Sequence, residues 1–330
     1  MSVGPTPPVG GPPPGPLATG QAVSAAAAAT PLAQAPDPVA PLMQRAVEAA
    51  RADGAIRQSG QGPLLADLSR ALESPHLPAN LKAAIRQLLA FGLNAGAPPD
   101  AAALRAAVAR SGLFLEARLA QTPTAPPYDM KAALLALSQA LTAAGATSPG
   151  RPARATAAPP TRGGAVAGQA ARAAILKADD PPEQQLAILR DETDQALARQ
   201  TLHQLASLPD DSGQRWMFEL PMMTPQGAAV AQFAIERDDP GPGGGPDAAP
   251  AWRARFALDI PPLGPVLVHV RLQGERSTAV LWVDRAESLA HLREQAPRLA
   301  QALSGDVVIH PGAPPSAPTP APGALVDRSS

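Results

Sequence analysis

The chain has 330 residues, enough for two domains, but its 42 prolines and 27 glycines are too many for a wholly packed structure of that length. Proline, glycine and alanine bury little apolar area, so segments built from them do not offset the roughly 1–2 kcal/mol per residue that ordering a backbone costs. The net charge of −1 and the lack of a basic, aromatic-rich cluster exclude nucleic acid as an expected partner, and the absence of cysteine excludes disulfides and thiolate sites.

The N-terminal segment, residues 1–37, is rich in proline, glycine and alanine, and we expect it to be disordered. The first basic residue is Arg45, so the alanine run before it lacks the positive flank of a secretory signal and is too short to span a membrane. We therefore expect neither secretory-signal export nor membrane insertion. A small-residue, disordered start of this kind is compatible with a type III export signal.

A helical module is predicted for residues 38–146, where leucines recur at helical spacing between Pro/Gly breaks. Asp100 and Asp129 each precede such a run, and a carboxylate there can accept the free amide protons of a first helical turn. The leucines that form stripes are Leu64, Leu65, Leu68 and Leu72, then Leu81, Leu88 and Leu89 with Ile85, then Leu134, Leu135, Leu137 and Leu141.

Residues 147–170 return to a linker composition of proline, glycine and alanine. A long helix then begins after Pro181-Pro182 and runs to about Leu208. We assign residues 171–312 to one C-terminal domain with its central motif at 252–310, and residues 313–330 to a disordered tail.

Short runs with alternating apolar residues predict strands in this C-terminal domain. In the run 266–272 the side chains of Val266, Val268, Val270 and Leu272 are expected to face inward, and those of His269 and Arg271 outward. The predicted strands cover 215–220, 229–237, 252–260, 266–272, 277–283 and 307–310. The sequence leaves open whether the two strands within 215–237 join the same sheet as the others.

One helix follows the strand that ends at Val283. Asp284 and Glu287 have the spacing of a capping box, Pro297 lies inside the helical pattern, and Gly305 is expected to close it. Its stripe is Leu289, Leu292, Ala296, Leu299 and Leu303. The fold class is thus α+β: a small mixed or antiparallel C-terminal sheet with one packed helix, preceded by a helical module and long disordered segments.

The residues give no sign of catalysis, a metal site or a cofactor site. Gly243 to Gly245 lack the lysine of a phosphate-binding loop, and the paired aspartates lie in expected linkers or caps. The histidines form no metal-binding pair and are expected to be solvated; they are His76, His203, His269, His291 and His310. We therefore expect a protein that is not an enzyme and that binds no cofactor.

The stretch 258–305 resembles the C-terminal domain of flagellar hook-length control proteins, the FliK family. It contains an apolar strand, a proline-x-leucine-glycine turn, a valine-alternating strand, a further strand and a leucine-rich helix with a central proline, in the family's order. The residues that match the family motif are Pro262, Leu263 and Gly264 in the turn, Val266, Val268 and Leu272 in the strand, and Leu292, Leu299 and Leu303 in the helix.

The resemblance implies a protein that is made in the cytoplasm and then secreted through the flagellar type III apparatus. Its N-terminal part would report hook length, and its C-terminal domain would contact the cytoplasmic domain of the export gate protein FlhB. This contact would switch export from hook-type to filament-type substrates. Hook and hook-cap subunits are further partners that the resemblance suggests, and we expect a monomer. The helical module at 38–146 departs from the extended measuring segment of the family.

Two alternatives stay open from the sequence. An injectisome needle-length regulator would have a related domain and much the same pattern. A scaffolding protein, in which the Pro/Ala-rich half tethers an α+β module, would never be exported.

Overall fold

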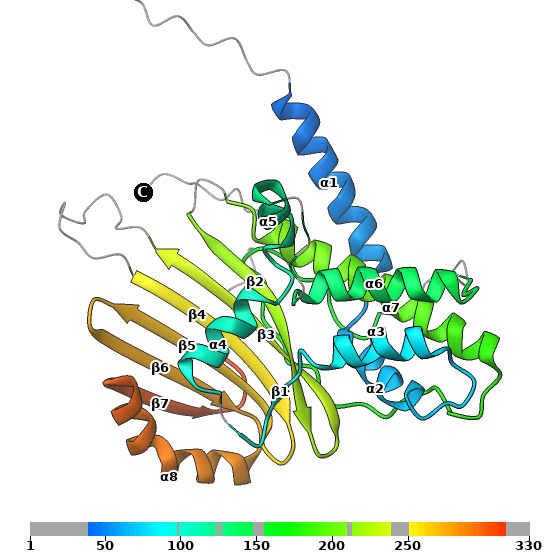
Figure 1. The fold of residues 1–330 in the computed structure, drawn as a ribbon. Coiled ribbons are helices and arrows are strands. Elements are labelled where there is room, and N and C mark those ends of the chain that lie inside the picture. Colours follow the sequence, from blue (N-terminus) through cyan, green and yellow to red (C-terminus); the bar gives the residue numbers. More distant parts are fainter. Residues whose placement is uncertain are drawn as a thin grey trace, which may run out of the picture. The chain divides into compact units, whose positions relative to one another are not determined.

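The computed structural model describes residues 39–97, 99–122, 124, 126, 128–147, 155–209, 213–238 and 251–314 (Figure 1). The segments expected to be disordered, 1–37 and nearly all of 313–330, lie outside these ranges. The chain divides into two compact units, Met1–Leu42 and Met43–Ser330, and the architecture below is that of the second. It combines helices with one mixed sheet, which confirms the predicted α+β class.

The helices of the described residues are α1 (Ala40–Arg57), α2 (Gln61–Ala71), α3 (Ala79–Leu89), α4 (Ala101–Ala109), α5 (Leu115–Gln121), α6 (Met130–Ala143), α7 (Pro182–Ala206) and α8 (Ala286–Leu303). Both predicted aspartate caps are confirmed. Asp100 accepts a hydrogen bond from the Ala103 amide at 2.7 Å, and Asp129 accepts from the amides of Lys131 and Ala132. These bonds satisfy amides that the first helical turn leaves free.

A helical core lies where α2, α3, α6 and α7 pack together. Its fully buried side chains come from the predicted leucine stripes and include Leu68, Leu81, Leu137 and Leu141. Leu189 of α7 packs into the same core. The expected helical module therefore shares its apolar face with a helix that the sequence places in the C-terminal domain. The boundary between the two domains stays a prediction.

Seven strands of the described residues form one sheet in chain order, from β1 to β7. The two outer pairings, β1 with β2 and β6 with β7, are parallel, and the other pairings are antiparallel. The strands are β1 (Leu93–Asn94), β2 (Arg215–Thr224), β3 (Gly227–Asp238), β4 (Ala251–Ile260), β5 (Gly264–Gln273), β6 (Arg276–Val283) and β7 (Gly305–Pro311). Since β3 pairs with β4, the strands within 215–237 do join the sheet of the motif.

The two faces of the sheet are covered differently. Phe218, Phe233 and Phe256 stack across β2, β3 and β4 on one face, with ring centroids 5.1 and 5.4 Å apart. Helix α4 packs over the β2 end of this face, and α8 packs over β6 and β7. On the other face α7 contacts β2 and α2 contacts β3. Alternation of side chains along each strand produces this division.

The described part of the linker-like segment, from residue 155 onward, has fixed contacts with the sheet. Val166 is buried, and the backbone of Gln169 exchanges two hydrogen bonds of 2.9 Å with Val230. A Cβ at Gly168 would lie 2.6 Å from the carbonyl carbon of Leu258. The small side chains of this segment give it the composition of a linker. In the structure they allow its backbone to approach β4 closely.

Four expectations from the sequence are wrong. Leu272 is 43% exposed, because it lies next to the Gly274 turn and beyond the apolar cluster under α8. Asp284 does not cap α8: its amide bonds to the Pro265 carbonyl, and Arg285 takes the N-cap position without a side-chain bond. Gly305 opens β7, since Ser304 in left-handed backbone ends the helix. His203 is not solvated but fully buried.

Candidate partner-binding site

The turn that carries the family-like motif is fixed to the start of α8. Arg285 donates a hydrogen bond of 3.1 Å from Nη1 to the Pro262 carbonyl, and Ser288 donates one of 2.7 Å from Oγ to the Leu263 carbonyl. Ser288 is buried, so this contact is shielded from water. These two hydrogen bonds join the Pro262–Gly264 turn to the N-terminal end of α8.

Gly264 has a structural reason to be glycine. Its φ of +73° lies in the left-handed region, and the Arg285 side chain occupies the space that a Cβ would need. Any other residue would therefore meet both backbone strain and a clash with the side chain that holds Pro262.

Burial raises the pKa of Asp259 at the neighbouring end of β4, and the positive charge of Arg285 opposes this increase.

Most of the predicted site residues pack against one another. The apolar cluster between α8 and the sheet contains Val266 and Val268 of β5, Leu263 of the turn, and Leu292, Leu299 and Leu303 of α8. These six side chains position the helix on the sheet. Of the remaining three, Gly264 is buried, whereas Pro262 and Leu272 are exposed. The structure thus brings six of the nine residues into one core and presents two to the outside.

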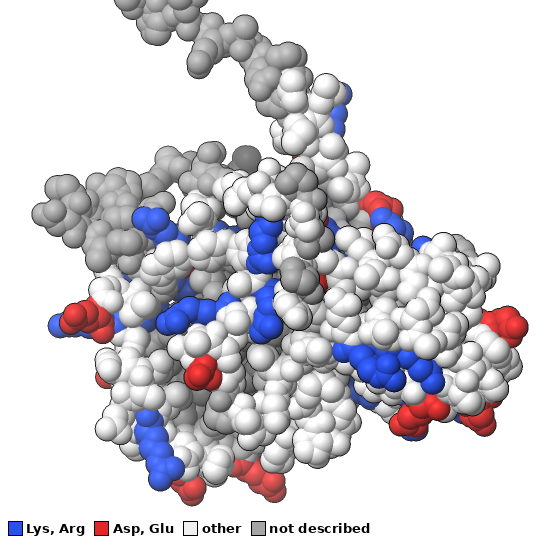
Figure 2. Space-filling view, viewed as in Figure 1, with Lys and Arg blue, Asp and Glu red and all other residues white. Residues whose placement is uncertain are grey.

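The outward side of α8 is a candidate contact surface that the leucine stripe did not reveal. It carries exposed residues of both charge signs, which are Glu287, His291, Arg293, Glu294 and Arg298. Figure 2 shows blue and red side chains at the lower left, over α8, without a large patch of one sign. The sequence signal for this surface is the set of polar positions between the leucines, which a helix places opposite the apolar stripe.

A group of polar side chains lies buried between α7 and the sheet. Arg199 forms a bidentate ion pair with Glu219, with bonds of 2.6 to 2.9 Å, and also donates to Gln58 and to the Ala158 carbonyl at 2.8 Å. Gln169 donates to the same carboxylate. Burial alone would raise the pKa of Glu219, but the charges of Arg199 and His203, together with the hydrogen bonds from Arg199, lower it to about 2.

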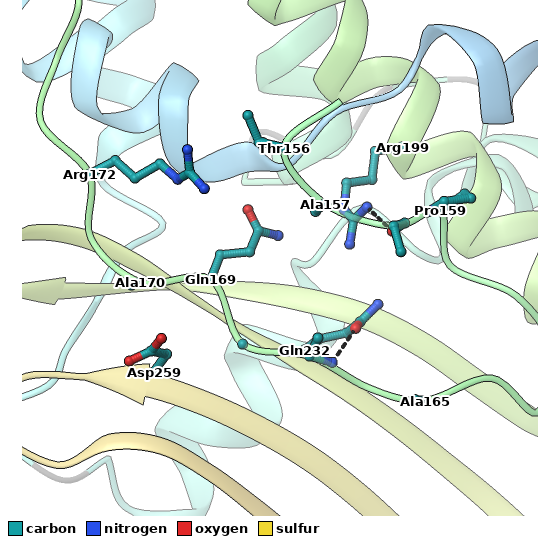
Figure 3. A pocket seen from close by; sticks show the side chains of 13 residues that line it. Thr156, Ala157, Pro159, Ala165, Gln169, Ala170, Arg172, Arg199, Gln232 and Asp259 are labelled. Atoms are coloured by element: carbon teal, nitrogen blue, oxygen red, sulfur yellow. Dashed lines mark hydrogen bonds between the residues drawn. The ribbon is translucent and has the colours of Figure 1, made fainter. Parts of the chain in front are cut away.

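This polar group borders a cavity of about 380 Å³ (Figure 3). Gln169, Gln232, Arg172 and Asp259 project toward it from the extended segment and from the sheet. Arg199 is already bonded to Glu219, and Gln232 accepts a hydrogen bond of 2.8 Å from the Ala167 amide. These bonds hold the extended segment to the sheet. Within the described ranges, no group of three or more His, Cys, Asp or Glu side chains is placed to bind a metal ion.

No helix among the described residues is long and apolar enough to cross a membrane.

The region from β4 to β7 with α8 combines strands with one helix. The Pro262–Gly264 turn in this region is hydrogen-bonded to the start of α8, and the outward side of α8 is exposed. The family model described as flagellar hook-length control protein FliK matches residues 243–307. This part of the chain is therefore similar to the hook-length control domain of the FliK family. Searches of curated proteins and of solved structures gave no match to the chain.

Proposed function

We propose that this protein switches the flagellar type III export apparatus from hook-type to filament-type substrates when the hook reaches its set length. The observation that carries the proposal is that the FliK family match, residues 243–307, covers the strands and the helix that hold the Pro262–Gly264 turn. The protein acts by contact, without catalysis. It is made in the cytoplasm and is itself secreted through the flagellar apparatus.

The cytoplasmic domain of FlhB is the proposed partner, and Pro262 with the outward side of α8 is the proposed contact surface. Apart from Leu272, the leucines and valines of the motif belong to the apolar cluster beneath the helix, so they support the surface without touching the partner. Mixed charges at an exposed helix favour a specific, polar contact, since complementary charges select the partner and the register. Hook and hook-cap subunits are proposed as further partners of the segments before the sheet.

The test is hook length measured by electron microscopy after deletion of the gene in its native host. We expect abnormally long hooks without filaments, restored to normal by the wild-type chain. A variant that reverses two charges on α8, Arg293→Glu with Arg298→Glu, should fail to restore switching while remaining folded. The matched control is Arg86→Glu, an exposed arginine on α3, which should restore it fully.

Two other results would replace the proposal. Normal hooks and filaments in the deletion strain would favour an injectisome needle-length regulator. A chain that is never found in the culture medium of a secreting strain would favour a scaffolding role. Binding of the purified chain to the cytoplasmic domain of FlhB, measured by calorimetry with the same variants, separates loss of contact from loss of export.

A further inference from the structure

The sheet face opposite α8 carries an apolar groove over β4, β5 and β6. Leu267 and His269 of β5 and Trp282 of β6 lie on this face, because they alternate with the valines that point toward α8. The groove has a volume of about 840 Å³. The helical cover of the same face lies over β2 and β3, where α7 and α2 pack.

The walls of the groove come from two extended segments. One wall is the strip from Ala165 to Gly168, which is fixed to the sheet by the bond between Ala167 and Gln232. The other is the end of the described chain, Gly312 to Pro314. The Gly312 amide donates a hydrogen bond of 2.9 Å to the Val283 carbonyl, and its φ of +75° turns the chain after β7. That turn brings Ala313 and Pro314 to the groove.

The floor of the groove is suited to proline. Trp282 contacts His269 edge-on, with ring centroids 4.7 Å apart, and stacks with His310 at 6.0 Å. Grooves lined by aromatic side chains recognise proline-rich chains, because such chains are already extended and lose little conformational entropy on binding. Pro314 already lines this groove, and Pro265 lies beside it.

We propose that the chain's own segment 315–330 docks in this groove. The segment follows directly on Pro314, contains four further prolines, and carries only two charged residues, Asp327 and Arg328. Sixteen residues at about 3.1 Å each reach much farther than the groove requires. Because the segment is attached at the groove, its effective concentration there is on the order of millimolar, so even weak intrinsic binding fills the site. The inference goes beyond the proposed export switch and does not rest on it.

The experiment uses the full chain with Trp216→Phe and Trp252→Phe, so that Trp282 is the fluorophore. A second version replaces residues 315–326 by a Gly/Ser sequence, and a matched control replaces the equally long proline-rich stretch 5–16. We expect the first replacement, and not the control, to increase acrylamide quenching of Trp282. Unchanged quenching after the first replacement, or increased quenching in the control, would overturn the proposal.

Addition of a synthetic peptide of residues 315–330 provides the second measurement. In the chain with residues 315–326 replaced, the peptide should reverse the increased quenching in a saturable manner. Its apparent affinity for the chain that keeps its own segment should be about tenfold weaker, since the tethered copy competes for the groove. Leu267→Glu should abolish peptide binding, whereas Leu272→Glu, on the same strand and the opposite face, should not. A peptide with Leu325 and Val326 changed to Ser should bind more weakly. Equal binding of the original peptide to both chains would overturn the proposal.

Discussion

Arg199 of α7 and Glu219 of β2 form a bidentate ion pair that is almost completely removed from water, with side chains 2% and 0% exposed. Arg199 also bonds to Gln58, ahead of α2, and to Ala158 of the extended segment. The pair therefore connects a helix, a strand and two irregular segments that are far apart in the sequence. Buried charges of this kind tolerate the loss of one partner poorly, because the other remains uncompensated.

Replacement of Arg199 by Met is expected to lower the free energy of unfolding by about 3–5 kcal/mol, since Glu219 would stay buried without its counter-charge. The measurement is urea unfolding followed by circular dichroism. Arg70→Met is the control: Arg70 forms an exposed pair with Glu73, and its loss should change stability by about 0–1 kcal/mol. An equal effect of the two substitutions would contradict a special role for the buried pair.

The same pair predicts a loss of stability in acid. The pKa of Glu219 is about 2 in the folded chain, against an ordinary value of 4.5, so its contribution is complete above pH 4.5 and is lost as the pH falls from 4.5 toward 2. The shift corresponds to about 3 kcal/mol. Unfolding free energies measured across this pH range should show the decrease in the wild type, and Glu219→Gln should flatten it. An unchanged slope in the variant would assign the acid sensitivity to other carboxyl groups.

The raised pKa of Glu192 predicts that the stability of the fold decreases as the pH increases. Burial, and then the neighbouring charges of Asp67 and Asp191, raise its pKa to about 9. Glu192 Oε2 and Asp67 Oδ2 are buried without a donor when both groups are ionised, whereas one shared proton satisfies both. The protonated form is stable in the folded chain, so stability is complete below pH 4.5 and decreases as the pH rises toward 9.

Glu192→Gln is therefore expected to stabilise the chain above neutral pH, because the amide can donate to Asp67 at every pH. The free energy of unfolding should decrease by about 1 kcal/mol per pH unit between pH 5 and 9 in the wild type, and less in the variant. Urea unfolding at a series of pH values gives both slopes. Glu183→Gln, an exposed position at the start of the same helix, is the control and should keep the wild-type slope. Parallel slopes for Glu192→Gln and the wild type would show that Glu192 is ionised in the folded state.

Gly168 tests the packing of the extended segment on the sheet. An alanine there would place a Cβ 2.6 Å from the Leu258 carbonyl carbon and 2.7 Å from the Asp259 nitrogen, and backbone atoms cannot move aside cheaply. We expect Gly168→Ala to lower the free energy of unfolding by about 1–3 kcal/mol. Gly62→Ala is the control, since its Cβ would find its nearest neighbour at 3.6 Å. Thermal unfolding compares the two, and a neutral Gly168→Ala would mean that the segment is not held against β4.

The sequence predicts the C-terminal strands well, because alternation of apolar residues is a local signal, and it predicts the Asp100 and Asp129 caps for the same reason. It does not predict that the helices before residue 146 share a core with α7, since that depends on contacts between distant stripes. Nor does it indicate the pairing of Arg199 with Glu219, because charged residues in a helix or a strand are usually exposed. The proline-x-leucine-glycine motif indicates the turn at Pro262–Gly264. The sequence does not indicate the outward surface of α8, because the leucines dominate the pattern.

Gly264 links the stability of the turn to the proposed switch. Gly264 and Gly274 are both in left-handed backbone at the two ends of β5, but only Gly264 has a neighbour, Arg285, in the place of a Cβ. Gly274→Ala should therefore show only the backbone cost of about 1–2 kcal/mol. Gly264→Ala should in addition displace Arg285 from the Pro262 carbonyl and loosen the turn from α8.

We expect Gly264→Ala to fail in restoring normal hook length to the deletion strain, and Gly274→Ala to succeed. Urea unfolding of both variants shows whether enough folded chain is present, because a loss of 1–2 kcal/mol leaves a chain of ordinary stability folded. Arg285→Ala supplies an independent route to the same defect, since it removes the bond to Pro262 without changing the backbone of the turn. If Gly264→Ala and Arg285→Ala both restore normal hooks, the fixed geometry of the turn is not required for switching. The contact surface would then have to be sought on the outward side of α8 alone.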